Sequence, residues 1–454
     1  MSTSALLLIA LASVVLLLLL VIKAKAHPFV ALLIVSLLVA FATGIPADKI
    51  ITTIEKGMGG LLGHIASIII LGSMLGVLIE ISGGAESLAK TLTGVLGSKR
   101  TIAALTIVAF ILGTPVFFEV GFIIIIPLIY GFSKVAHVSP LKFGLPMAGV
   151  MLTVHVALPT HPGAAAAAGI LHSDVGWLML AGIGVSVVVG IVGYFVARFI
   201  NRRHYHLSIN VLEQQQTAEV PDLSVNAQQT RLPPPNALVI GGLIVVPIML
   251  IVSGTLCQAL LLPESAVRQL MTVIGTPPVA LLISLGLASW TLGIRRRMSL
   301  KKLGEVTGSA IPSSADVILV AGAGGAFGGV LVASGIGNAL AEALETIHLP
   351  LMPAAFLLSL VLRASQGSAT VAILTTSGLL SQAVIGLDPI QLVLVTLATC
   401  FGSLGLSHVN DAGFWVVTRY LGLSVPDGLK TWTVLTTIMG VTGFLITWLL
   451  WFVL

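Results

Sequence analysis

The sequence has few charged residues. Only 9% of its 454 residues are Asp, Glu, Lys or Arg, whereas 57% are hydrophobic and the mean hydropathy is +1.10. Soluble proteins carry roughly a quarter charged residues, so this composition excludes an ordinary soluble fold. The apolar residues form long runs, whereas a transmembrane β-barrel would show short alternating segments. We therefore predict an all-α polytopic membrane protein.

Cysteine and nucleotide-binding motifs are also scarce. The chain has two cysteines, Cys257 and Cys400, both in apolar surroundings, so we expect neither a disulfide framework nor a metal site. A glycine-rich stretch, Gly322-Ala323-Gly324-Gly325, lacks the Gly-Lys-Ser that completes a P-loop. We predict no cofactor and expect an ion gradient to supply any energy. The net charge of +5 lies mostly in loops and indicates membrane topology, not nucleic-acid binding.

Apolar segments long enough to span a membrane recur along the chain and predict about 10–12 spans. Some contain an internal interruption by polar residues, glycine or proline. The predicted segments are 5–22, 28–46, 57–81, 101–131 (interrupted), 141–172 (interrupted), 175–200, 236–254, 275–294, 306–333, 352–386 (interrupted), 389–420 (interrupted) and 431–454.

The first apolar run, Ala5 to Ile22, is followed by Lys23 and Lys25, and no charge precedes it. A signal peptide has the opposite order, so we predict an uncleaved helix with its N-terminus outside. The only long polar segment covers 201–235, and we interpret it as a cytoplasmic linker. The expected domains are therefore a first transmembrane repeat (1–200), this linker, and a second repeat (236–454).

The two halves resemble each other at an offset of 252 positions, which aligns Gly72 with Gly324 and Gly76 with Gly328. Their loop charges differ, because the loop that contains Arg295 to Lys302 is strongly basic and its counterpart in the first half is not. Basic loops stay in the cytoplasm, so opposite bias at equivalent loops predicts opposite orientation. We expect two inverted repeats, an arrangement found in many secondary transporters.

Each half contains a predicted re-entrant hairpin. The tips are Gly113 to Glu119 and Arg363 to Thr370, which the same offset aligns. A re-entrant tip presents helix N-termini and free N–H groups, which suit an anionic group. We expect Pro115 to open the second arm of its hairpin as a first-turn proline.

Each half also contains a predicted broken helix. The breaks are Thr153 to Gly163, with two histidines and two prolines, and Leu404 to Gly413, with Ser407, His408, Asn410 and Asp411. Polar groups at membrane depth are costly and are usually functional. The alternative is that a histidine here simply hydrogen-bonds a neighbouring helix.

Two charged residues stand out at the hairpins. Arg363 suits a carboxylate through its bidentate fork, but it could also snorkel to an interface or pair structurally with Glu119 or Asp411. Glu119 follows Phe117 and Phe118. Apolar surroundings favour the protonated form of a carboxyl group, which suits a proton carrier.

These segments together resemble the gluconate:proton symporter family of bacterial permeases over nearly the whole chain. The resemblance implies import of a small hydroxylated monocarboxylate, gluconate or a related sugar acid, by proton symport across the bacterial inner membrane. A D-serine-like amino acid stays an alternative substrate, and the residues alone leave proton versus sodium open. Glu119 departs from the Asp expected in many relatives. The motifs lie at 113–121, 142–146, 155–163, 362–370 and 407–415.

The family is similar to a broader superfamily of inverted-repeat transporters, which implies a scaffold domain, a mobile transport domain and a homodimer. The expected partners are a small organic anion, protons, the lipid bilayer and a second copy, with no nucleic acid. The predicted substrate-binding residues are Arg363, Ser365, Gln366, Ser368, Thr370, Asn410, Asp411 and Thr114. The predicted proton-coupling residues are Glu119, Asp411, His155, His161 and His408.

A rival interpretation is an intramembrane metal-dependent hydrolase that uses His155, His161, His408 and Asp411. No His-Glu-x-x-His motif supports it, and paired repeats favour a transporter. We therefore expect no enzymatic activity, no catalytic residues and no metal.

Overall fold

The computed structural model describes residues 1–97, 100–203, 205, 207–208, 211, 235–346, 349–408 and 411–454, and this part of the chain is helical. Its first half contains α1 (Thr3–Leu18), α2 (Pro28–Ala42), α3 (Ala47–Ile81), α4 (Gly84–Leu96), α5 (Thr101–Gly113), α6 (Phe118–Val135), α7 (Leu141–Ala157), α8 (Pro162–Leu171) and α9 (Val175–Ile200). A π-helical turn, η1 (Leu19–Lys23), extends α1.

The second half is helical as well. It contains α11 (Ala237–Leu260), α12 (Ala266–Ile274), α13 (Pro277–Ala288), η3 (Ser289–Gly293), η4 (Ile294–Arg296), α14 (Leu300–Gly308), α15 (Ala310–Ala333), α16 (Ile336–Thr346), α17 (Leu351–Gln366), α18 (Ala369–Leu380), α19 (Pro389–Leu404), α20 (Ala412–Leu421), α21 (Val425–Gly428), η5 (Leu429–Thr433) and α22 (Val434–Val453).

The predicted membrane character is confirmed. Six helices in the described part of the chain are long and apolar enough to cross a bilayer, and further apolar helices of 10–17 residues accompany them. The prediction missed the short helices α4, α12, α14 and α16. Each of these helices contains both polar and apolar residues in every turn, so no long apolar run marks its position in the sequence. The helix predicted over 57–81 begins ten residues earlier, at Ala47.

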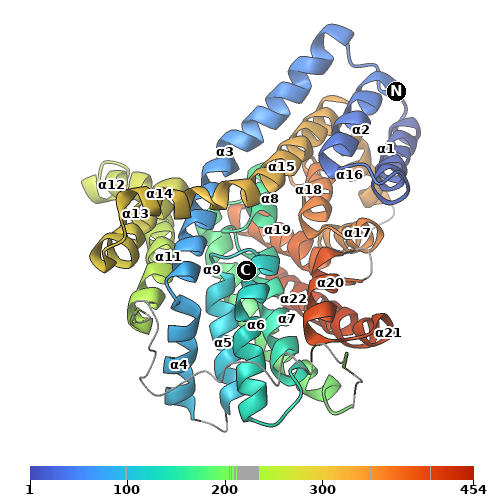
Figure 1. Ribbon diagram of the computed structural model, residues 1–454. Coiled ribbons are helices and arrows are strands. Elements are labelled where there is room, and N and C mark those ends of the chain that lie inside the picture. The colour runs from blue at the N-terminus through green and yellow to red at the C-terminus, as the bar shows by residue number, and fades with distance from the viewer. Residues whose placement is uncertain are drawn as a thin grey trace.

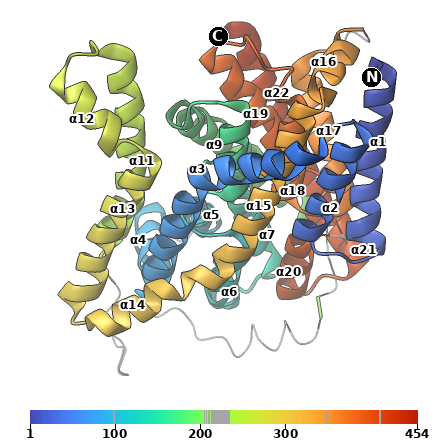
Figure 2. The ribbon, with the colours of Figure 1, turned by 90° about the horizontal axis from the view of Figure 1, so that it is seen from above.

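Figures 1 and 2 show α11 to α14 along one edge of the molecule and α1 with α2 at the opposite edge. Between them, α3 and α15 cross in direct contact. A Cβ atom on Gly57 of α3 would lie 2.5 Å from the Gly325 carbonyl oxygen of α15, so the two backbones approach as closely as glycine allows. In Figure 2, α14 lies at the end of the molecule opposite to α12 and the N-terminus.

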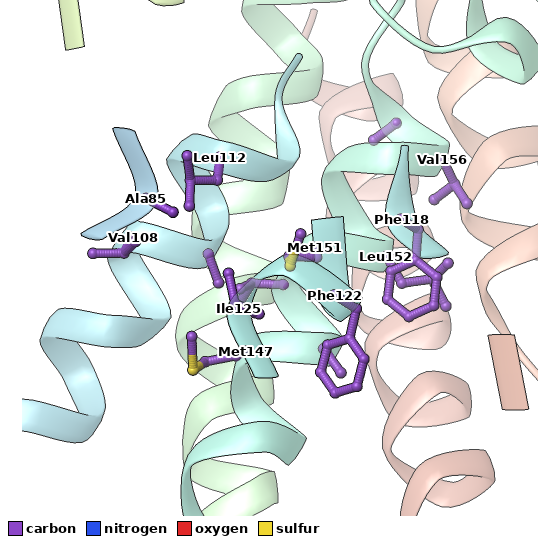
Figure 3. Close-up of a cluster of buried hydrophobic side chains, with 14 of the residues drawn as sticks. Ala85, Val108, Leu112, Phe118, Phe122, Ile125, Met147, Met151, Leu152 and Val156 are labelled. Atoms are coloured by element: carbon purple, nitrogen blue, oxygen red, sulfur yellow. The ribbon is translucent and has the colours of Figure 1, made fainter. Parts of the chain in front are cut away.

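The first hairpin is held by an apolar cluster, drawn in Figure 3. Phe118 and Phe122 of α6 are buried and stack on each other, with ring centroids 6.1 Å apart. Leu112 of α5 and Met151 of α7 belong to the same buried core. This packing fixes the hairpin against α7, and so positions the turn between α5 and α6 beside the break that follows α7.

Two glycines at equivalent positions of the halves have the same backbone conformation. Gly83 and Gly335, which the offset of 252 positions aligns, both adopt left-handed backbone conformations, with φ of 81° and 78°. Each lies at the start of a short helix that leads into a hairpin. Glycine is suited to both positions because it has no Cβ atom to clash.

Candidate functional site

Both predicted hairpins are present. The first turns at Thr114 to Phe117, between α5 and α6, and the second at Gly367 and Ser368, between α17 and α18. Gly367 ends α17 in a left-handed conformation with φ of 85°, which glycine adopts without strain. The Ser368 hydroxyl then accepts a hydrogen bond from the Val371 N–H and caps α18.

The expectation for Pro115 is wrong. Helix α6 begins at Phe118, so Pro115 lies within the turn and does not open the arm. A Cβ atom on Gly76 of α3 would lie 3.0 Å from the Pro115 carbonyl oxygen. The turn therefore packs closely on α3 at a position where α3 has no side chain, and the second arm begins three residues after Pro115.

Both predicted helix breaks are also present. The first separates α7 from α8 over 158–161. The second lies between the end of α19 at Leu404 and the start of α20 at Ala412. Pro162 opens α8 in the first turn, where no backbone N–H is needed. Leu406 has φ of 51°, a strained conformation for a leucine, and its N–H is satisfied by the Thr437 hydroxyl at 3.1 Å.

The second hairpin and the second break are joined by a buried ion pair. Arg363 is 1% exposed, and its Nη2 lies 2.5 Å from Asp411 Oδ2. Its Nη1 donates to the Gly367 carbonyl oxygen at the hairpin tip. Of the alternatives for Arg363, pairing with Asp411 is therefore the observed geometry. Arg363 Nε has no hydrogen-bond partner among the described residues.

Asp411 is held on both carboxylate oxygens. Oδ1 accepts from the Gly413 N–H, which caps α20, and Oδ2 accepts from the Ser407 hydroxyl as well as from Arg363. The Ser407 hydroxyl in turn accepts from Trp432 Nε1 at 2.7 Å. A charge buried in this way needs such a complete set of partners.

Trp432 connects this network to the first hairpin. It is fully buried, and its indole stacks on the Phe118 ring with centroids 5.8 Å apart. Phe118 is the first residue of α6 and precedes Glu119. The second break and the first hairpin therefore meet through one aromatic pair.

The first break carries a pair of histidines. The rings of His155 and His161 lie 4.6 Å apart between centroids, and Phe117 packs 6.2 Å from each. His161 is 1% exposed, and its Nε2 lies 2.8 Å from the Gly113 carbonyl oxygen. The Nδ1 atoms of both histidines and the Thr160 hydroxyl are buried without a hydrogen-bond partner in the described part of the chain.

Four helix N-termini meet around these groups. A Cβ atom on Gly163 of α8 would lie 3.6 Å from Thr370 Cα at the start of α18, and one on Gly413 of α20 would lie 3.1 Å from the Phe118 ring of α6. The Arg363–Asp411 pair connects the tip before α18 with the start of α20, and His161 connects α8 with the tip before α6. Helix N-termini carry partial positive charge, so their convergence favours a bound anion.

The site also concentrates side-chain charge. Glu119 is partly buried in the first turn of α6 and interacts electrostatically with Asp411 and Arg363. His155 interacts electrostatically with His161 and Arg363. Residues of both hairpins and both breaks therefore belong to one cluster.

The other predicted residues are placed as follows. His408 is partly buried, and its Nε2 lies 2.7 Å from the Ala364 carbonyl oxygen. Thr114 donates to the Phe110 carbonyl oxygen at 3.2 Å. Asn410 lies outside the described residues, as do the side chains of Ser365 and Gln366.

Sequence reasoning missed the supporting residues. The predicted binding and coupling residues do not include Ser407 and Thr160, which lie in the two breaks. They also do not include Trp432 and Thr433 of η5. The Thr433 hydroxyl donates to the Ser407 carbonyl oxygen at 2.5 Å. The available signal was the polar start of an otherwise apolar helix, Lys430-Thr431-Trp432-Thr433.

Comparison with known proteins assigns the family. Residues 5–453 match the model of the GntP family permeases. The chain belongs to this family. The inner membrane permease YgbN of Escherichia coli K12 is 62% identical over 100% of both chains. The gluconate permease of Bacillus licheniformis is 38% identical over 98% of this chain and 99% of that protein. The gluconate permease of Pseudomonas aeruginosa is 34% identical over 99% of this chain and 98% of that protein.

Two solved structures share the fold of this GntP family permease. The MtrF protein of Neisseria gonorrhoeae superposes with a TM-score of 0.67 at 15% identity, covering 92% of this chain and 94% of that one. The YdaH transporter of Alcanivorax borkumensis superposes with a TM-score of 0.59 at 13% identity, covering 92% of this chain and 98% of that one. At these identities the likeness concerns the fold alone.

The family membership confirms several predictions. The chain is a multi-span permease of the inner membrane and not an enzyme, so the hydrolase interpretation is wrong. Several of the residues assigned to a hydrolase have protein partners instead. His161 and His408 each turn Nε2 to a backbone carbonyl oxygen, and both oxygens of Asp411 have protein partners.

Proposed function

We propose that this permease imports a small hydroxylated monocarboxylate, gluconate or a related sugar acid, by proton symport. The observation that carries the proposal is the buried Arg363–Asp411 pair, which links a hairpin tip to a helix break where four helix N-termini meet. The names of the relatives support the substrate class, since three of the most similar are gluconate permeases.

The substrate carboxylate binds Arg363. A guanidinium group has five N–H donors, and the described residues engage Nη1 and Nη2 while Nε is without a partner. A carboxylate oxygen at Nε supplies the partner that this buried nitrogen lacks among the described residues. Ser368, Thr370 and Thr114 supply hydroxyl groups at the two tips, and Ser365, Gln366 and Asn410 belong to the same proposed binding set.

Proton coupling follows from charge balance. Arg363 and Asp411 together are neutral, so an incoming carboxylate adds one uncompensated negative charge to a buried site, which is costly. A proton on Asp411 removes that charge and frees Arg363 for the substrate. Glu119, which interacts electrostatically with both residues, offers a second proton position. Anion and proton therefore bind together and leave together.

We assign the proposed transport cycle to two inverted repeats, residues 1–200 and 236–454, joined by a cytoplasmic linker over 201–235. The matching helix order and the paired left-handed Gly83 and Gly335 support the repeat. In such folds one bundle moves against the other around a central site. Here that means a mobile domain against a scaffold, in a homodimer.

The test is uptake of radiolabelled gluconate into proteoliposomes that contain the purified permease. We expect saturable uptake that accumulates against a gradient when the outside is more acidic, and that collapses with a protonophore. A sodium gradient should have no effect. Accumulation of D-serine in place of gluconate would contradict the substrate class, and transport that does not respond to pH would contradict the coupling ion.

A further inference from the structure

The first helix break holds buried polar atoms that the carboxylate site does not use. His155 Nδ1, His161 Nδ1 and Thr160 Oγ1 are all buried without a hydrogen-bond partner in the described part of the chain. Buried polar groups are usually hydrogen-bonded, and leaving one unsatisfied costs about 1–3 kcal/mol. One of these atoms lies near the end of α7 and two lie in the break that follows it, and together they indicate that a ligand supplies the missing partners.

The hydrogen bond to Gly113 fixes the chemistry of that partner. A carbonyl oxygen only accepts, so His161 Nε2 must donate to it across the 2.8 Å contact. In a neutral imidazole the other nitrogen then carries a lone pair. His161 Nδ1 therefore needs a donor, which a hydroxyl group provides and a carboxylate does not.

The position of the break relative to Arg363 fits an elongated ligand. Arg363 interacts electrostatically with His155, and the start of α8 contacts the start of α18, which follows the tip that Arg363 braces. Helix α8 also begins without a side-chain cap, whereas Ser368 and Asp411 cap α18 and α20. The backbone N–H groups at its first turn are thus available to hydroxyl oxygens.

We infer that His155, Thr160 and His161 form the subsite for the hydroxyl groups of the substrate, separate from the carboxylate subsite at Arg363. This inference rests on the proposed function and deepens it, because it selects polyhydroxy acids over short or apolar carboxylates. Each hydroxyl group donates to a histidine nitrogen and accepts from Thr160 or a backbone N–H of α8. In this inference His155 and His161 act as hydrogen-bond acceptors for substrate hydroxyl groups, which replaces the proton-coupling role predicted for them from the sequence.

The decisive variant is His161→Gln. A glutamine amide nitrogen takes the place of Nε2 and can still donate to the Gly113 carbonyl oxygen, but the lone pair at the Nδ1 position is lost. Thr160→Val is a second variant that removes a hydroxyl at nearly constant shape. Ser186→Ala on α9 is the matched control, because Ser186 is also fully buried without a described partner and lies outside the site.

The measurement is competition by glycolate, glycerate, threonate and gluconate, which carry increasing numbers of hydroxyl groups, against labelled gluconate in proteoliposomes. We expect wild-type affinity to rise along this series. His161→Gln and Thr160→Val should each lower the apparent affinity for gluconate about three- to tenfold, which is equivalent to the loss of one hydrogen bond. Both should leave glycolate unchanged, and Ser186→Ala should match the wild type throughout.

Three results would overturn the inference. One is an equal loss of affinity for every acid in the series. Another is unaltered gluconate affinity in both site variants. The third is a changed pH dependence of accumulation with unchanged selectivity, which would make the histidines proton carriers. If the wild type binds none of these acids, the proposed function fails together with the inference. If the wild type binds them and the variants lose affinity equally for every acid, only the inference fails.

Discussion

Arg363 and Asp411 form an ion pair 2.5 Å long across 48 residues of sequence, and their side chains are only 2% and 7% exposed. Arg363 lies in the last turn of a hairpin arm, and Asp411 caps the second half of a broken helix. Removing either partner would leave an uncompensated buried charge, which typically costs several kcal/mol. In the proposed mechanism, Arg363 therefore exchanges Asp411 for the substrate carboxylate when Asp411 takes up a proton, so that neither charge is left without a partner.

The substitution Arg363→Lys keeps the charge and loses the fork that engages Gly367 and Asp411 together. We expect the apparent affinity for gluconate to fall roughly ten- to a hundredfold, because a charge-assisted hydrogen bond contributes about 1.5–3 kcal/mol. Ser368→Ala should weaken binding in the same direction. Arg268→Lys is the control, because Arg268 is partly buried on α12, outside the site. Affinities unchanged within about twofold in both site variants would move the carboxylate elsewhere.

Asp411→Asn imitates a permanently protonated carboxyl group. Exchange of labelled for unlabelled substrate across the proteoliposome membrane should persist, because it needs no net proton movement. Uphill accumulation driven by a pH gradient should be lost. Asp388→Asn is a matched control, since Asp388 also caps a helix N-terminus, that of α19, and is exposed. Gradient-driven accumulation at the wild-type level in Asp411→Asn would remove Asp411 from coupling.

Glu119→Gln keeps size and hydrogen bonding but cannot titrate. For each proton no longer carried, accumulation should fall about tenfold per unit of pH gradient, since one pH unit is equivalent to about 1.4 kcal/mol. The steady-state accumulation ratio, measured at several imposed gradients, gives this slope directly. An unchanged slope at normal expression would make Glu119 structural.

The topology prediction concerns two exposed residues, Ser208 and Glu264. In a background with Cys257 and Cys400 replaced by serine, Glu264→Cys should react with an impermeant thiol reagent added to intact cells. Ser208→Cys should react only after the cells are permeabilised, because it lies in the predicted cytoplasmic linker. Rapid labelling of Ser208→Cys from outside would overturn the inversion of the repeats.

The contact between α3 and α15 makes a stability prediction. A Cβ atom on Gly57 would lie 2.5 Å from the Gly325 carbonyl oxygen, whereas one on Gly59 of the same helix would meet nothing within 4 Å. Gly57→Ala should therefore lower the thermal unfolding midpoint in detergent, by the equivalent of about 1–3 kcal/mol. Gly59→Ala should match or exceed the wild type, because alanine favours a helix. An unfolding midpoint of Gly57→Ala equal to that of the wild type would show that α3 and α15 can move apart without loss of stability.

Much of the fold was predictable because it depends on local properties of the chain. Long apolar runs require helices in a bilayer, where each backbone group must find its hydrogen bond within its own segment. Clusters of glycine, proline and polar residues within those runs, as at Pro159 to Gly163 and Ser407 to Gly413, mark where such helices end. The short helices α4 and α16 escaped prediction because their hydropathy is that of a loop.

The sequence by itself determined the membrane class, the hairpins and breaks of each half, and most residue types of the candidate site. From the sequence, Arg363 could pair with a substrate carboxylate, Glu119 or Asp411. Only the tertiary packing shows that it pairs with Asp411. Packing also brought in Trp432 and left His161 Nδ1 without a partner while its Nε2 bonds Gly113. The reason is that hydropathy and backbone preference act over a few residues, whereas a hydrogen bond between distant segments depends on how whole helices pack.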